Sequence, residues 1–432
     1  MDTVTRKMAR AGQAGLNVSA IFCVVSVRSE GADRNAGNPR SQRGSTRTMT
    51  EHRGTQPSEA KGTVIAFSAP GCEPLYAHER EAMAAVARTI ASLKGFAFQQ
   101  GLVNSSGNGE GLYFVPDDSL LATDAARLGI GGPQDLFGGV VPWRFAMTKA
   151  ITHELVDGLA KRPKEWSTGF GRTVSAAVLP GYTVFSRHDA LRAAERLLRL
   201  GVARLKPPLS SRGQDQHIVR TVADFERLLE RYRSSDLDEC GLVLEADLRE
   251  IVTLSVGRTE IDEIIVAYYG TQRTTIDNAG QSVYGGSDLI VVRGGWEALE
   301  DLQLPHALAL ATVQARAYDA AMADYPGFFA SRRNYDIGQG LDSSGIWRSG
   351  VLEASWRIGG SSTAELAAIK VMKQDPDIQL VRASAVKEFG HISRLPANAD
   401  VHFQGEDPDE GPITRYTVIT QAIREPANCA GS

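Results

Sequence analysis

The chain has 432 residues and a formal net charge of −4, with 23% charged and 42% hydrophobic side chains. This length predicts two or three domains, and the composition is that of a globular protein with a sizeable core. The net negative charge argues against a general nucleic-acid binder, which needs a basic face to release counterions. The four cysteines, Cys23, Cys72, Cys240 and Cys429, have no paired spacing, so we expect neither disulfides nor a zinc site, and a reducing cytoplasm.

Residues 1–61 differ in composition from the rest of the chain. Residues 29–62 contain almost no large apolar side chains, so this stretch cannot bury enough surface to offset its chain entropy, and we expect it to be disordered. The apolar run ahead of it, AGLNVSAIFCVVSV, is broken by polar residues and is too short to span a membrane. We therefore expect no membrane association. We also expect that the sequence before Met49 is an extension and that Met49 is the candidate true initiator.

Ordered structure is expected from Gly62 onward. The run TVIAFSAPG predicts a buried strand that ends in a Pro-Gly turn, and residues 78–93 carry apolar side chains at helical spacing. Short apolar runs in GLYFVPDDSL and GGVVPWRF predict further strands of the same sheet. A strand followed by a helix is a typical beginning of an α/β domain, so residues 62–145 are predicted to form one.

The next region presents two lysines. TKAITHEL predicts the start of a helix that carries Lys149, and an amphipathic helix, RHDALRAAERLLRLG, follows a predicted strand in LPGYTVFS. VARLKPPLSSRGQ predicts a strand that delivers Lys206, and then a loop with Ser210, Ser211 and Gly213 whose backbone N–H groups can bind an anion. The alternative interpretation of Lys206 is a solvated strand-end lysine, as most lysines are.

Two further strand pairs follow. GLVLEADLREIVTLSV predicts two strands joined by a turn, with Glu245 at the end of the first and Glu250 at the start of the second. AYYGTQRTT and SVYGGSDLIVVRGG predict an antiparallel pair, on which Gln272, Arg273 and Arg293 are candidate ligand contacts. Hairpins rich in Gly and aromatic residues are more often plain structure, so this interpretation stays open.

The stretch GVLEASWRIGGSS, residues 350–362, carries the most specific chemistry. Glu353, Ser355 and Arg357 follow at every second position, which places them on one face of a strand. The preceding RRNYDIGQGLDSSGIWRSG predicts a strand pair that brings Asp336 close to Glu353. Carboxylates and a guanidinium on one face can hold Mg²⁺ and the phosphates that it carries, although a half-exposed strand with one ion pair is the alternative.

The order of these motifs resembles the ATP-grasp superfamily over residues 62–395. The closing motif of that family is commonly E-x-N-x-R followed by Gly or Pro, similar to E-x-S-x-R-x-G-G-S here. The resemblance implies an α/β (α+β) fold in which the amino-terminal domain, 62–145, precedes two α+β subdomains, 146–240 and 241–395, that sandwich the nucleotide. The remaining residues, 396–432, are expected to form an irregular tail.

The resemblance also implies ATP and Mg²⁺ as cofactors, with a role for each matching residue. The residues that would contact ATP are Lys149, Lys206, Ser210, Ser211, Gly213, Glu245 and Glu250, and Arg273 of the predicted hairpin is added to them as a candidate contact. Those that would hold Mg²⁺ are Asp336, Glu353 and Ser355, and those with a catalytic role are Lys206 and Arg357.

The implied activity is that of a ligase, which transfers the γ-phosphoryl group of ATP to a small-molecule carboxylate for attack by an amine or similar nucleophile. A homodimer is left open. Ser355 stands where the family usually has a metal-binding Asn, which keeps two alternatives open: a kinase-like member, and an ATP-binding module with reduced catalysis. P-loop NTPases and common hydrolases are disfavoured, because the sequence has no G-x-x-x-x-G-K-[ST], G-x-S-x-G or H-E-x-x-H motif.

Overall fold

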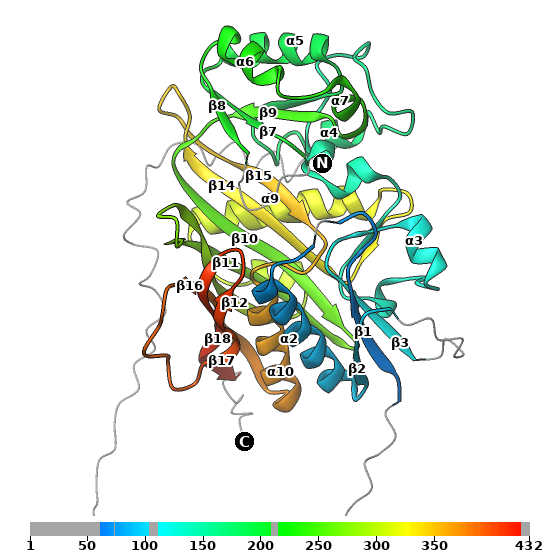
Figure 1. Cartoon of the computed structure of the whole chain (residues 1–432), viewed down its shortest axis with the longest axis vertical. Coiled ribbons are helices and arrows are strands. Elements are labelled where there is room, and N and C mark those ends of the chain that lie inside the picture. Colours follow the sequence, from blue (N-terminus) through cyan, green and yellow to red (C-terminus); the bar gives the residue numbers. More distant parts are fainter. Residues whose placement is uncertain (1–60, 73, 103–110, 209–214, 425–432) are drawn as a thin grey trace, which may run out of the picture.

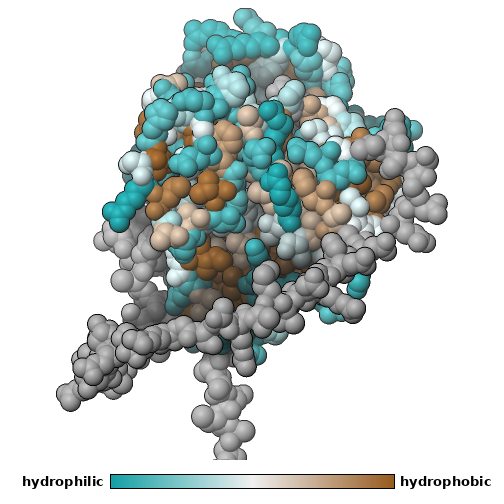
Figure 2. All heavy atoms as spheres, turned by 60° about the horizontal axis from the view of Figure 1, so that its bottom comes forward, coloured by the Kyte–Doolittle hydropathy of each residue, from teal (hydrophilic) through white to brown (hydrophobic). Residues whose placement is uncertain are grey.

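The computed structural model describes residues 61–72, 74–102, 111–208 and 215–424 (Figure 1). Within these ranges, none of the helices has the length and apolar composition needed to cross a membrane. On the face shown in Figure 2, apolar patches are interrupted by hydrophilic side chains, and hydrophilic residues dominate its upper end.

The amino-terminal unit is a parallel sheet of three strands, in the order β2-β1-β3, with one long helix against it. Its elements are β1 (Thr63–Phe67), α2 (Ala77–Lys94), β2 (Ala97–Gln100) and β3 (Leu112–Pro116). The Ala-rich α2 ends at Gly95, which has a left-handed φ of 68° that glycine adopts without steric cost. The predicted first strand and helix are confirmed here.

A second, small sheet joins distant parts of the chain. Its strands, in the order β13-β5-β4, are β4 (Leu120–Leu121), β5 (Gly139–Val141) and β13 (Phe329–Ala330), and α3 (Ala122–Arg127) follows β4. The prediction that GGVVPWRF adds a strand to the first sheet is therefore wrong, because β5 pairs with β4 and β13 instead. The periodicity of a short apolar run does not specify its partner strand.

A separate α+β unit lies at the top of Figure 1 and contains an antiparallel sheet in the order β6-β9-β7-β8. Its strands are β6 (Gly181–Val184), β7 (Ala203–Lys206), β8 (His217–Val219) and β9 (Leu242–Ala246). Its helices are α5 (Arg187–Leu198), α6 (Val222–Leu229) and α7 (Ser234–Cys240). The unit has its own apolar core, in which α5 and α6 pack on the sheet.

The largest element is an eight-stranded sheet in the order β15-β14-β10-β11-β12-β16-β18-β17. Its strands are β10 (Arg249–Ile261), β11 (Ile264–Ile276), β12 (Ser282–Arg293), β14 (Arg332–Leu341), β15 (Trp347–Ser355), β16 (Ile378–Phe389), β17 (Asp400–Asp407) and β18 (Gly411–Arg424). The helix α9 (His306–Ala323) packs on one face, and α10 (Ser362–Gln374) packs with α2 on the other. The structure thus confirms the predicted fold class, an α/β amino-terminal unit followed by two α+β units.

The expectation that the chain forms an irregular tail from residue 396 is wrong. Residues 400–424 form β17 and β18, and β18 pairs with β16 over most of its length. β17 has a polar sequence, DVHFQGED, because it is an edge strand that needs no continuous apolar face. The run ITRYTVIT in β18 is rich in β-branched residues, and this composition indicates a strand in the sequence.

The remaining helices are short. They are η2 (Pro133–Asp135), η3 (Arg144–Met147), η4 (Lys149–Thr152), α4 (Phe170–Val174) and α8 (Trp296–Glu300). The helix expected from TKAITHEL is therefore only the single turn η4, which Thr148 caps by accepting a hydrogen bond from the Ala150 N–H. After this turn the chain becomes extended at His153.

Candidate functional site

Two carboxylates face each other across the β14-β15 hairpin. Asp336 is directly opposite Glu353 in the strand register, as the sequence predicted. Asp336 accepts hydrogen bonds from Asn334 Nδ2 at 2.9 Å and from Ser255 Oγ at 3.4 Å. Burial, and then the neighbouring charge of Glu353, raise the pKa of Asp336 above its ordinary value. The hairpin therefore places two like charges side by side.

A buried lysine reaches this pair from η4. Lys149 Nζ lies 3.2 Å from Glu353 Oε2, and the Lys149 side chain is only 2% exposed, whereas Glu353 is 31% exposed. Four residues later, His153 Nε2 lies 3.3 Å from Glu245 Oε2 in the small α+β unit. The segment 149–153 therefore contacts the carboxylates of both units.

The lysine of the small unit is also buried. Lys206 ends β7 and forms an ion pair with Glu245 on the neighbouring strand β9. Burial opposes ionisation, but the charges of Lys206 and His153 hold the pKa of Glu245 below its ordinary value. The interpretation of Lys206 as a solvated strand-end lysine is thus wrong, because only 4% of its side chain is exposed.

The closing motif continues past the end of β15. Ser355, the last residue of the strand, lies opposite Asn334, so an amide side chain comes from β14 next to the serine. Arg357 lies beyond the strand, where its Nε is 3.6 Å from Asp118 Oδ1 of the amino-terminal unit. The expected alternation on one strand therefore ends at Ser355, and Arg357 faces the junction with the first unit.

Arg273 is not brought to this site. Gln272 donates a hydrogen bond to Ser255 Oγ at 3.0 Å, which places Gln272 on the side of Asp336. Successive side chains of a strand point to opposite faces, so Arg273 projects to the other face, where it forms an ion pair with Asp288. Gln272, and not Arg273, is the ligand candidate that lies beside the carboxylate pair.

Other predicted residues also lie apart from the pair or outside the described ranges. Glu250 is exposed near the start of β10, with a left-handed φ of 52°. Ser210, Ser211 and Gly213 lie outside the residues that the structure describes.

Sequence reasoning missed a buried network that supports the closing motif. Arg332 donates to Glu365 Oε1 at 2.7 Å, and Glu365 also accepts from Thr259, Tyr268 and Ser361 at 2.7–3.0 Å. Arg332 also donates to the main-chain oxygen of Arg357. Burial opposes the ionisation of Glu365, but Arg332 keeps its pKa below the ordinary value. Arg332, Asn334 and Asp336 alternate along β14, which places Arg332 on the face of Asp336 but does not indicate its contact with Glu365.

The donor set at the hairpin fits a hard cation. Among the described residues, no group of three or more His, Cys, Asp and Glu side chains is arranged as a metal site. Mg²⁺ in nucleotide sites is bound by one or two carboxylates, together with phosphate oxygens and water, and Asp336 and Glu353 supply two. Ser355 adds a neutral oxygen atom to the donor set, whereas Asn334 directs its Nδ2 to Asp336 and accepts from the Tyr268 hydroxyl with its Oδ1.

Comparison with solved structures finds several synthetases and a carboxylase at low identity. N5-carboxyaminoimidazole synthetase from Staphylococcus aureus, in complex with ADP, is 13% identical over 85% of this chain and 96% of that chain, with a TM-score of 0.48. Biotin carboxylase from Campylobacter jejuni is 12% identical over 82% and 87% of the two chains, with a TM-score of 0.42. D-alanyl-alanine synthetase A from Vibrio cholerae is 10% identical over 69% and 89%, with a TM-score of 0.40. Likeness at this level does not establish an activity.

A search of curated proteins finds no match to this sequence. One family model, described as DUF3182, protein of unknown function, matches residues 70–417. This match covers most of the chain, and the protein therefore belongs to the DUF3182 family.

Proposed function

We propose that this protein is an ATP- and Mg²⁺-dependent ligase of the ATP-grasp type, which phosphorylates a small-molecule carboxylate for attack by an amine or similar nucleophile. The observation that carries this proposal is the like-charged pair Asp336 and Glu353, with Lys149 at 3.2 Å from Glu353. Two adjacent carboxylates repel each other unless a cation lies between them. Mg²⁺ bound to a polyphosphate would supply that cation, and the nearby Lys149 would contact the phosphate oxygens.

The proposed nucleotide site lies between the small α+β unit and the large sheet. Lys149 and Lys206 would contact the phosphates, and Glu245 would contact the adenosine side of the site. Lys149 forms an ion pair with Glu353 of the hairpin, and Lys206 forms one with Glu245 within the small unit. The segment 149–153 contacts both the hairpin and the small unit. A nucleotide bound between the units would meet both lysines.

Phosphoryl transfer needs charge neutralisation and positioning more than covalent help from the protein. Mg²⁺, when bound by Asp336, Glu353 and the neighbouring Ser355, would supply charge neutralisation for the phosphates. Arg357 would bind the phosphoryl group or its acceptor, since a guanidinium binds such oxyanions through two hydrogen bonds. Its contact with Asp118 supports the proposal that the amino-terminal unit presents the substrate to it.

The proposal is tested by incubating the purified protein with Mg-ATP and pooled carboxylate and amine metabolites, and by measuring ADP release. We expect ADP release that depends on Mg²⁺ and on at least one carboxylate pool, with a ligated product. Absence of both ATP binding and ADP release in every pool would contradict the proposal.

Ser355 favours a second candidate, an ATP-binding module with reduced catalysis, because a serine hydroxyl is a shorter and weaker metal ligand than the Asn amide. Binding of ATP without steady ADP production would support this candidate. A kinase-like activity would instead yield a phosphorylated carboxylate or hydroxyl product with no ligated amine, and product analysis distinguishes it from a ligase.

A further inference from the structure

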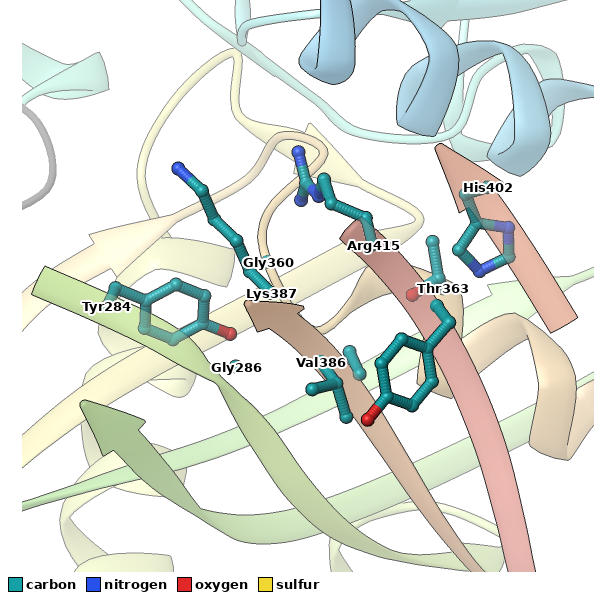
Figure 3. Close-up of a pocket in the computed structure, with 10 residues that line it drawn as sticks. Tyr284, Gly286, Gly360, Thr363, Val386, Lys387, His402 and Arg415 are labelled. Carbon is teal, nitrogen blue, oxygen red and sulfur yellow. The ribbon is translucent and has the colours of Figure 1, made fainter. Parts of the chain in front are cut away.

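The pocket shown in Figure 3 is too small to hold a substrate. It lies where the amino end of α10 meets strands β12, β16 and β18, and its volume is about 10 Å³, which is room for about one water molecule. This pocket therefore adds no site for a small-molecule ligand. A buried histidine between the small α+β unit and the large sheet, His153, has contacts that bear on the proposed nucleotide site.

His153 donates a hydrogen bond to a carboxylate of the small unit. Its Nε2 lies 3.3 Å from Glu245 Oε2, and the two side chains are 1% and 2% exposed. The pKa of Glu245 lies below its ordinary value despite its burial, so this carboxylate is ionised at neutral pH. An ionised carboxylate only accepts hydrogen bonds, and the donor is therefore the Nε2–H of His153.

Gly181 of β6 makes room for the imidazole ring. A Cβ atom at position 181 would lie 2.7 Å from His153 Cε1 and 2.7 Å from the main-chain oxygen of Leu244, so a larger residue would displace the ring or the strand. Gly181 is directly opposite Glu245 in the register of β6 and β9. The ring is therefore held at the end of β9 that carries Glu245.

Glu245 connects His153 to Lys206. Its Oε1 pairs with the Lys206 ammonium and its Oε2 with His153, and all three side chains are at most 4% exposed. Because both oxygens have a partner, the carboxylate cannot turn without breaking one of the two contacts. His153 thus fixes the orientation of Glu245, and the carboxylate in turn directs the ammonium group of Lys206.

The segment 149–153 is attached to both units by further hydrogen bonds. On the side of the small unit, the main-chain oxygen of Ala150 accepts from Thr183 Oγ1 at 2.6 Å. On the side of the large sheet, Thr152 Oγ1 lies 3.1 Å from the Tyr318 hydroxyl of α9. The same segment begins with the lysine that pairs with the β14-β15 hairpin. It therefore connects the hairpin to the small unit over a few residues.

We propose that His153 is a positioning residue of the nucleotide site, which sets the spacing between Lys149 and Lys206. It orients Lys206 through Glu245, and it attaches the segment of Lys149 to the small unit. This inference rests on the proposed binding of ATP between the units. Without the imidazole, Glu245 could turn, and the two ammonium groups would lose the fixed separation that favours phosphate binding.

The test measures the affinity of the full-length protein for Mg-ATP by isothermal titration. His153→Leu removes the donor and should weaken binding about tenfold, the effect of losing one hydrogen bond to a charged group. His153→Gln keeps an N–H donor and should bind within about threefold of the parent. His188→Leu is the matched control, because His188 is an exposed histidine in α5 of the same unit, and it should bind as the parent does.

A double-mutant cycle separates positioning from a purely structural role. In the Lys206→Ala background, His153→Leu should weaken ATP binding by a clearly smaller factor than in the parent, because the lysine that it orients is absent. A purely structural histidine would cost the same factor in both backgrounds. Melting temperatures show that each variant is folded, and His153→Asn, whose amide is too short to reach Glu245, replaces the Leu variant if that variant unfolds.

Parental ATP affinity in the variant without the donor, or equal losses in the two backgrounds, would overturn the inference and leave the proposed function in place. If the parent itself does not bind Mg-ATP, the proposed function fails, and the positioning role of His153 fails with it.

Discussion

Two charged clusters lie four residues apart along β14, at Arg332 and at Asp336, and they differ in how their charges are balanced. Arg332 and Glu365 have opposite charges and are at most 1% exposed, and Glu365 also accepts hydrogen bonds from three hydroxyl groups. Asp336 has another carboxylate, Glu353, directly opposite it, and Lys149 Nζ lies 3.2 Å from Oε2 of Glu353.

The difference separates a structural role from a functional one. A buried ion pair that is fully hydrogen-bonded needs nothing further, and breaking it leaves an uncompensated charge. A pair of like charges has an energetic cost in the folded protein, which a bound cation would remove. We therefore expect the first cluster to determine stability and the second to determine ligand binding.

The largest expected effect is on the structural cluster. Arg332→Met should lower the free energy of unfolding by about 3–5 kcal/mol, because it leaves Glu365 buried without its partner. Urea denaturation measures this loss. The double variant Arg332→Met, Glu365→Leu should recover most of it, since apolar replacement of both partners is often neutral. A single variant as stable as the parent would show that the network is not structural.

A smaller effect is expected at the lysine of the small unit. Lys206→Ala should weaken ATP binding by about 1–3 kcal/mol, the range for the loss of a charge-assisted contact. Titration of ATP measures it, with Lys161→Ala as the control, because Lys161 is an exposed lysine of the same unit that pairs with Asp238. Equal ATP affinity in the parent and the Lys206 variant would remove Lys206 from the site.

Acid pH should remove the stabilisation that the cluster of Arg332 and Glu365 contributes. The folded-state pKa of Glu365 is below its ordinary value of 4.5, so the stability that its carboxylate contributes is complete above about pH 4.5 and is lost as the pH falls through the folded-state pKa. The free energy of unfolding of the parent should therefore fall more steeply below pH 4.5 than that of the Arg332→Met, Glu365→Leu double variant. Parallel curves would contradict the role given to Glu365.

The sequence predicted the hairpin pair because its signal is local. Asp336 and Glu353 lie on two strands joined by a short Gly/Ser turn, so period-two alternation and a hairpin are enough to bring them together. Lys206 and Glu245 were also singled out, but their mutual ion pair depends on which strands of the small sheet are neighbours. Strand order is not contained in the periodicity of either segment.

The remaining errors have the same physical origin. Gln272 and Arg273 are adjacent, and a register shift of one residue would exchange the faces to which they point, so the sequence could not decide between them. The contact between Arg332 and Glu365 joins a strand to a helix 33 residues away, and no local pattern indicates it. Strand β17 was missed because an edge strand can be polar.

The most direct test of the account is Glu353→Gln, with the melting temperature measured with and without Mg-ATP. The substitution removes a metal ligand, relieves the repulsion of Asp336 and gives up the ion pair to Lys149, so we expect little change in the stability of the free protein and loss of the Mg²⁺-dependent stabilisation by ATP. Glu260→Gln is the control, because Glu260 is a partly exposed carboxylate paired with Arg258 on the same sheet. If Glu353→Gln keeps the full Mg²⁺-dependent stabilisation of the parent, the carboxylate pair is not a metal site, and the proposed function loses its main support.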